Sequence, residues 1–184
     1  MGLGLLLLGY LFCLNLLNVY FLPFAAAVMF WALKKLSFVN TSLSRAKFVL
    51  IPLFFVGLAG LGLAIAQTVA GEIPFYDKLM CLLSCLSHAG MLCFLFLLLT
   101  GIRHLADEVN LPLLSFRAVR NRLFCFFYYL PAFLLELPFW KTGLFLQTAS
   151  LFTVVLGVAV FVLNAKLLHD CYRMIGMPDT SEIQ

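Results

Sequence analysis

The sequence predicts an all-α polytopic membrane protein, a bundle of transmembrane helices, from its composition and from its uncharged stretches. Hydrophobic residues make up 64% of the 184-residue chain and charged residues 11%, against roughly 25% charged in an ordinary soluble domain. The stretches 48–71, 79–102 and 142–165 each carry no formal charge when histidine is neutral. A helix of that length is roughly 36 Å long, enough to cross a hydrocarbon core of about 30 Å. Most of this protein's surface is therefore expected to face lipid.

The stretch 1–33 contains no charged side chain and allows two arrangements. A single helix of that length would be about 50 Å long, which is more than one membrane crossing needs. Pro23 offers a break, because it cannot donate to the helix ladder. Either one long, kinked helix over residues 3–33 crosses once, or residues 3–17 and 22–36 form a hairpin or re-entrant pair. We prefer the single crossing, because it needs the fewest elements in a charge-free stretch.

The chain as a whole is predicted to be one integral membrane domain, residues 1–184, with five spans and a polar cytoplasmic tail at residues 166–184. The five expected spans are residues 3–33, 48–71, 79–102, 123–140 and 142–165.

The distribution of Lys and Arg predicts the orientation of these spans. The loops 34–47 and 103–122 carry four each, whereas the segments 72–78 and 141–143 carry one each. Loops rich in Lys and Arg stay in the cytoplasm. The two basic loops and the C-terminus are therefore expected inside, and with five spans the N-terminus lies outside. A hairpin over the first segment would move the N-terminus inside and leave every later loop unchanged.

The basic loop before the fourth span has the pattern of a short helix at the lipid interface. Leu113, Phe116 and Leu123 recur at helical spacing with arginines between them, which is typical of a helix lying on a membrane. Each arginine would gain roughly 1 kcal/mol from an anionic leaflet. The residues predicted to contact lipid headgroups are Arg117, Arg120 and Arg122.

Small residues at helical spacing predict close packing of the second and fifth spans against other helices. Such small-xxx-small patterns let two helix backbones approach each other. The predicted packing residues are Gly60, Gly62, Ala64 and Ala66 on the second span and Ala149, Thr153 and Gly157 on the fifth.

Polar residues from four spans are expected at overlapping depth in the outer half of the membrane. They are Gln67, then Ser84, Cys85 and His88, then Glu136, then Gln147. Ionisable groups within spans often mark functional sites, so one interpretation is a hydrated cavity with Glu136 as a cation or proton site and His88 at its floor. The alternative is structural. Glu136 then reaches the nearby interface, and His88 makes one interhelical hydrogen bond of about 0.6 kcal/mol.

No pattern in the sequence indicates an enzyme, a bound metal or a cofactor. Cys81, Cys85 and His88 share a helix face and suit zinc or copper(I), but a fourth ligand is not indicated. The six cysteines include no Cys-x-x-Cys pair and no disulfide framework. Ser84 has no base and orienting partner for nucleophilic catalysis. The net charge of +4 is too small to suggest nucleic acid as a partner.

The N-terminal region carries a series of short motifs. They are Gly9-Tyr10-Leu11-Phe12, Asn15, Pro23, Leu33-Lys34-Lys35-Leu36 and Arg45-Ala46-Lys47. As far as the last of these motifs, the pattern resembles an uncharacterised group of small multi-pass membrane proteins of Gram-positive bacteria. The resemblance implies a bacterial plasma membrane and carries no activity with it.

Two functions follow as hypotheses. The first is a non-enzymatic accessory or regulatory membrane module that lies in the lipid bilayer and packs against a partner membrane protein or a second copy of itself. The second is a transporter or a protein that binds a small ligand or cation in the outer-half cavity around Glu136 and His88.

Overall fold

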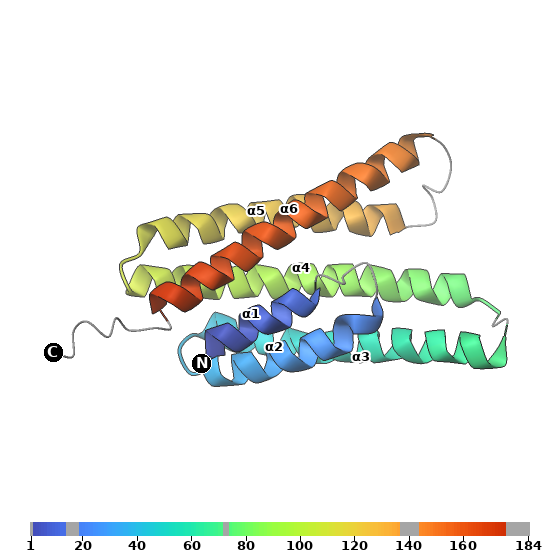
Figure 1. Cartoon of the computed structure of the whole chain (residues 1–184), viewed down its shortest axis with the longest axis horizontal. Helices are drawn as coiled ribbons and strands as arrows, with labels where there is room; N and C mark the ends of the chain where they lie inside the picture. The colour runs from blue at the N-terminus through green and yellow to red at the C-terminus, as the bar shows by residue number, and fades with distance from the viewer. Residues whose placement is uncertain (1, 14–18, 72–73, 137–143, 176–184) are drawn as a thin grey trace.

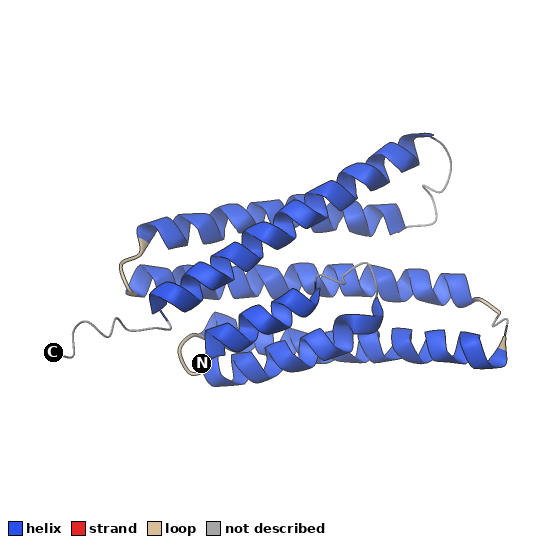
Figure 2. Cartoon of the chain, viewed as in Figure 1, coloured by secondary structure: helices blue, strands red, loops and turns tan. Residues whose placement is uncertain are grey.

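The computed structural model describes residues 2–13, 19–71, 74–136 and 144–175, and these residues form helices joined by short turns (Figure 2). The predicted all-α class is confirmed. The elements are α1 Gly2–Phe12, a 3-10 turn η2 Val19–Phe21, α2 Leu22–Leu36, α3 Thr41–Ala70, α4 Tyr76–Glu108, α5 Pro112–Glu136 and α6 Leu144–Ile175.

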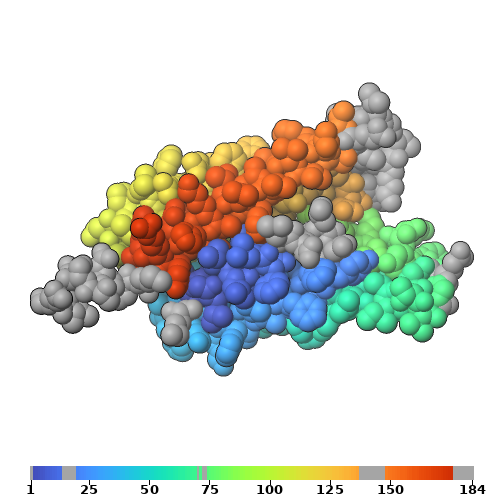
Figure 3. All heavy atoms as spheres, in the orientation of Figure 1, coloured from blue at the N-terminus to red at the C-terminus, as the bar shows by residue number. Residues whose placement is uncertain are grey.

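The helices form a closed ring in chain order. Each helix packs on the next, and α6 returns to pack on α1, so that α1 lies directly beside α6 (Figure 3). The four long helices α3 to α6 alternate in direction (Figure 1). We call one end of the bundle the basic end; it carries the start of α1, the turns 37–40 and 109–111, and the last turn of α6.

Three helices are long and apolar enough to cross a membrane: α3 over Thr41–Val69, α4 over Tyr76–Glu108 and α6 over Thr148–Ile175. They correspond to the three uncharged stretches of the sequence. The prediction of five spans is not confirmed. Helix α5 does not reach the same apolar content, because arginines occupy its first half, and residues 137–140 of the predicted fourth span lie outside the described part of the chain.

The preferred prediction for the first segment, one long kinked helix, is wrong. Helices α1 and α2 lie side by side and antiparallel, with Gly2 facing Leu36 and Gly9 facing Met29. A Cβ on Gly9 would lie 2.7 Å from the Met29 Cγ, so only glycine allows this approach. Pro23 lies in the first turn of α2, where its missing N–H interrupts no hydrogen bond. Pro23 therefore begins a helix rather than bending one.

The hairpin of α1 and α2 reaches only about halfway along the bundle. Helices of 11 and 15 residues are about 16 and 22 Å long, about a third and a half of the length of α3 and α4. Pro23 packs against Gly57, which lies near the middle of the uncharged stretch 48–71. The start of α1 consequently lies at the basic end, together with the end of α6 (Figure 1), and not at the opposite end as five spans required.

Helices α5 and α6 are longer than predicted at their basic ends. Helix α5 is continuous from Pro112 to Glu136 and includes the segment predicted as a separate interfacial helix. Helix α6 continues to Ile175, well into the predicted polar tail. Leu167, Leu168 and Cys171 are buried, because this extension packs on α1, which the five-span arrangement placed elsewhere.

One buried cluster of apolar side chains joins all six helices, and the outer faces stay apolar as well. Less of α3 and α6 than of α4 is buried inside the protein. Helix α3, for example, exposes Phe55, Leu58, Ile65 and Val69. Such faces are stable in lipid, which solvates apolar side chains as well as a protein core does.

The contact between Gly57 and Pro23 predicts a position that does not tolerate a side chain. A Cβ at Gly57 would overlap the Pro23 ring, whereas a Cβ at Gly62 on the same helix meets nothing within 4 Å. We expect Gly57→Ala to lower the free energy of unfolding by about 1–3 kcal/mol through overpacking, and Gly62→Ala to leave it unchanged. Unfolding in mixed detergent micelles, followed by circular dichroism, measures both. Equal stability of the two variants would contradict the seating of the hairpin on α3.

Candidate functional site

The structure brings Cys81, Cys85 and Glu136 together between α4 and the end of α5. The Cys81 thiol donates a hydrogen bond to the backbone carbonyl of Glu136, with a sulfur–oxygen distance of 2.9 Å. Cys85, one turn further along α4, is buried and lies within electrostatic range of Cys81 and Glu136. The Glu136 side chain is half-buried. These contacts join α4 to α5 at the end of the bundle away from the basic end.

Ser84 and His88 bond within α4. The Ser84 carbonyl accepts a hydrogen bond from the Ser87 hydroxyl at 2.8 Å, and His88 Nδ1 lies 2.8 Å from the same carbonyl. This contact requires the tautomer with a proton on Nδ1. The His88 ring faces the buried Tyr129 of α5 with 6.2 Å between ring centroids. Both bonds stay within α4, so among the described residues His88 does not make the interhelical hydrogen bond that the structural alternative expected.

The two glutamines of the predicted cavity occupy different positions. Gln67 is half-buried in the last turn of α3. The Gln147 side chain lies outside the described part of the structure. Of the predicted set, the structure thus brings together Cys85 and Glu136, whereas Ser84 and His88 bond within α4.

A second polar group, the asparagine cluster, consists of Tyr10, Asn121, Cys125 and Asn164. The Asn164 amide donates to the Tyr10 hydroxyl and to the Cys125 sulfur, both at 3.2 Å. The Asn121 amide donates to the Asn164 side-chain oxygen at 3.2 Å and to the Leu163 carbonyl at 3.0 Å. Tyr10 also stacks on Phe161, with 5.0 Å between ring centroids. The cluster ties α1, α5 and α6 together.

The asparagine cluster is fully enclosed. Asn121 and Asn164 are each 1% exposed. The Asn121 Nδ2 faces two oxygen acceptors, which fixes the orientation of its amide, and its Oδ1 has no hydrogen-bond partner among the described residues. Burying amides costs free energy unless they are hydrogen-bonded. The remaining bonds of the cluster therefore determine where α1 lies.

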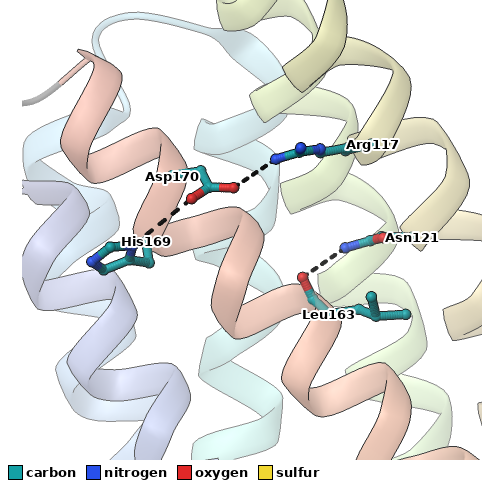
Figure 4. Close-up of polar contacts among 5 residues, drawn as sticks. All are labelled: Arg117, Asn121, Leu163, His169 and Asp170. Carbon is teal, nitrogen blue, oxygen red and sulfur yellow. Dashed lines mark hydrogen bonds and ion pairs between the residues drawn. The ribbon is translucent and has the colours of Figure 1, made fainter.

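An ion pair lies one turn from the asparagine cluster, at the basic end. Arg117 Nη1 donates to Asp170 Oδ2 at 2.8 Å, and His169 Nδ1 lies 3.8 Å from the other carboxylate oxygen (Figure 4). Arg117 and Asn121 are one helical turn apart on α5, and both bond to α6. A single face of α5 thus carries the polar contacts to α6.

The three arginines predicted to contact lipid differ in their surroundings. Arg117 pairs with Asp170 and faces the protein. Arg120 is exposed. Arg122 lies over the Phe96 ring of α4, with 4.8 Å between the guanidinium carbon and the ring centroid. They are therefore not equivalent as headgroup contacts.

The predicted packing residues also divide into inward-facing and outward-facing sets. Gly60 is buried, and Gly157 lies against the Tyr128 ring of α5, which a Cβ would approach to 2.7 Å. Gly62 is exposed with open space around it. The half-buried members are Ala64, Ala66, Ala149 and Thr153, of which Thr153 donates to the Ala149 carbonyl at 2.8 Å.

Sequence reasoning missed the asparagine cluster. Asn164 lies within an uncharged stretch, and Asn121 follows Arg117 and precedes Cys125 at i,i+4 spacing. This spacing places the three on one face of a helix. Two asparagines at such positions were the available signal, and they carry no charge that singles them out.

Replacement of Asn164 by leucine tests the role of the cluster. Asn164→Leu removes bonds to Tyr10, Cys125 and Asn121 together, and interhelical hydrogen bonds in membranes are worth about 0.6 kcal/mol each and at most about 1.7 kcal/mol. We expect a loss of about 1–2 kcal/mol in the free energy of unfolding in mixed micelles. Thr153→Val, which removes a bond within one helix, is the matched control and is expected to change little. A neutral Asn164→Leu would show that the cluster does not hold α1 in place.

Neither a metal-binding group among the described residues nor a similar known protein indicates a function. Among the described residues, no group of three His, Cys, Asp or Glu side chains is arranged to hold a metal ion. Comparisons of the chain with models of known protein families, with curated proteins and with solved structures give no match.

Proposed function

We propose that this chain is a multi-pass protein of the bacterial plasma membrane that acts as a non-enzymatic accessory or regulatory module. The observation that carries this proposal is that the buried asparagine amides bond between helices. The Asn164 side chain bonds to α1 and to α5 from α6, so the most deeply buried polar groups hold helices together rather than line a site. The plasma membrane of a bacterium is supported by the resemblance of the N-terminal region.

The proposed orientation places the basic end in the cytoplasm. The turns and helix ends at the basic end carry most of the Lys and Arg of the chain, and such loops stay inside. Helices α3, α4 and α6 cross the membrane, α5 crosses with its arginines at the cytoplasmic interface, and α1 and α2 form a hairpin that enters from the cytoplasm and returns. Both termini are then cytoplasmic, which replaces the outside N-terminus expected from five spans.

The proposed partner surface is the outer half of α3. Its exposed stripe contains Leu58, Gly62, Ile65 and Val69, and Gly62 has no atom within 4 Å of an added Cβ. An exposed glycine among large apolar residues lets a second helix approach closely. The partner that fits this stripe is a transmembrane helix of another protein or of a second copy of this chain.

A larger side chain at Gly62 tests the partner surface. We expect Gly62→Leu to leave the stability of the isolated protein unchanged, since the position faces open space, and to reduce the size of the complex seen by native electrophoresis after mild extraction. Ala159→Leu, at an exposed position of α6, is the matched control and is expected to leave the complex intact. A complex that survives Gly62→Leu would remove α3 as the partner surface.

A second function, the binding or transport of a small ligand or cation, is favoured by one observation. The hairpin stops near the middle of the bundle, and the half beyond it contains Glu136 with Cys81 and Cys85 beside it. A carboxylate at that depth is a candidate cation or proton site if water reaches it. Under this proposal the outer half is a hydrated vestibule.

Thiol labelling in intact cells decides between the two functions. Three single-cysteine proteins, native Cys85, Pro74→Cys and Phe38→Cys, are exposed to a membrane-impermeant maleimide, which reacts with hydrated thiolates. If the protein is an accessory module, only the cysteine at position 74 is labelled in intact cells. The cysteine at position 38 is labelled after permeabilisation, and Cys85 only after denaturation. Labelling of Cys85 in intact cells would favour the ligand-binding function. If the rate of this labelling then depended on pH, and Glu136→Gln removed that dependence, Glu136 would be identified as the site. If position 38 were labelled in intact cells and position 74 only after permeabilisation, the proposed orientation would be reversed.

A further inference from the structure

Arg122 lies in an unusual environment for a charged side chain, on the outer surface where α5 packs on α4. Its guanidinium lies over the Phe96 ring at 4.8 Å, and its Nη1 contacts the Thr100 hydroxyl at 3.4 Å. Phe96 is 47% exposed, so this surface faces outward. Both α4 residues belong to the uncharged stretch 79–102, which places Arg122 one to two turns inside the apolar part of α4.

Arg122 is not neutralised within the described part of the protein. The ion pairs found there are Arg103 with Asp107, Arg117 with Asp170 and His169 with Asp170. A guanidinium carries five N–H donors in a fixed plane that matches the oxygens of a phosphate. Stacking on Phe96 holds that plane in place, and donors beyond the one directed at Thr100 are available to an anionic ligand.

The surface beside Arg122 also has room for an acyl chain. Ala89, Cys93 and Phe96 follow one another at helical spacing on the same face of α4, and all three are exposed. The first two are small, so the α4 surface carries no large side chain at these two exposed positions. On α5, the exposed Phe126 lies one turn beyond Arg122. Toward the basic end, Arg103 follows Thr100 at i,i+3 spacing on this same face. A cationic position toward the basic end is thus followed by an apolar strip further along α4. The phosphate and the acyl chain of a phospholipid follow each other in the same order.

We propose that the surface around Arg122, where α5 packs on α4, binds one anionic phospholipid of the cytoplasmic leaflet. Its phosphate lies against Arg122, with Thr100 and Arg103 beside it, and one acyl chain runs over Ala89 and Cys93. This inference rests on the proposed membrane orientation and assigns a ligand that the accessory function does not require.

The test measures retention of phosphatidylglycerol by the full-length protein in non-ionic detergent. Native mass spectrometry counts bound phosphatidylglycerol at several lipid concentrations, with phosphatidylcholine as the neutral comparison. We expect one phosphatidylglycerol bound in preference to phosphatidylcholine. We also expect about tenfold weaker retention in Arg122→Gln, the factor for loss of one charge-assisted contact. Arg120→Gln removes an equally charged, exposed residue two positions away and is expected to retain the lipid as the unaltered protein does.

Two additional measurements separate a lipid site from other anion binding. Ala89→Trp fills the acyl-chain strip without touching the arginine and is expected to weaken retention, whereas excess inorganic phosphate is expected not to displace the lipid. Equal losses in Arg122→Gln and Arg120→Gln would overturn the site in favour of general attraction to the basic end. Displacement by phosphate would make it an ion site.

The membrane arrangement is tested separately. A protein that leaves the membrane on alkaline carbonate extraction would contradict the multi-pass arrangement itself. A protein that stays in the membrane, but whose variants all retain lipid equally, would contradict the lipid site alone.

Discussion

In the proposed membrane arrangement, the fold depends on how a helix that ends inside the bilayer satisfies its polar groups. The last carbonyls of an α-helix have no partner within the helix, and the hydrocarbon offers no water to replace it. Helix α1 ends at Phe12, near the middle of the bundle, so its end has to be enclosed by protein or by a hydrated space. The stacking of Tyr10 on Phe161 and the packing of Pro23 on Gly57 hold the hairpin against α6 and α3.

Polar side chains of this protein divide into those that bond within one helix and those that bond between helices. His88 and Thr153 bond to carbonyls one turn earlier in their own helices, which satisfies the side chain and leaves neighbouring helices free to move. Asn164 and Asn121 bond across helices and so restrict where those helices lie. Such bonds are individually weak in membranes, but the asparagine cluster combines several of them at the point where the short hairpin meets α6.

The sequence predicted the long helices well and the hairpin poorly, for a physical reason. The uncharged stretches 48–71, 79–102 and 142–165 define the apolar parts of α3, α4 and α6, because their length matches the bilayer. No charge marks the turn within the stretch 1–33, so the choice there depended on Pro23 and the glycines. Gly2 and Gly9 are separated by about two helical turns, which places them on one face of a helix, and only their contacts with α2 show what that face is for.

Depth within the membrane is easier to predict than rotation about a helix. Counting residues from the ends of the spans placed Glu136 near the depth of Cys85, and the structure places the two within electrostatic range of each other. Predicting the asparagine cluster requires knowing which helices are neighbours. Asn164 of α6 contacts Tyr10 only when α1 starts at the basic end and packs on α6. A single wrong topology for the first segment therefore hid the most buried polar side chains among the described residues.

The contacts of the arginines also bear on the orientation of the protein. Arg103 and Arg117 are paired with carboxylates, and such pairs weaken the local positive charge. Lys34, Lys35 and Arg45 have no carboxylate partner among the described residues. Acidic residues contribute little to the positive-inside rule, so the excess of Lys and Arg at the basic end is large when all Lys and Arg residues are counted. It persists when the paired arginines are left out. The Lys and Arg residues around the turn after the hairpin therefore support the proposed cytoplasmic position of the basic end even without Arg103 and Arg117.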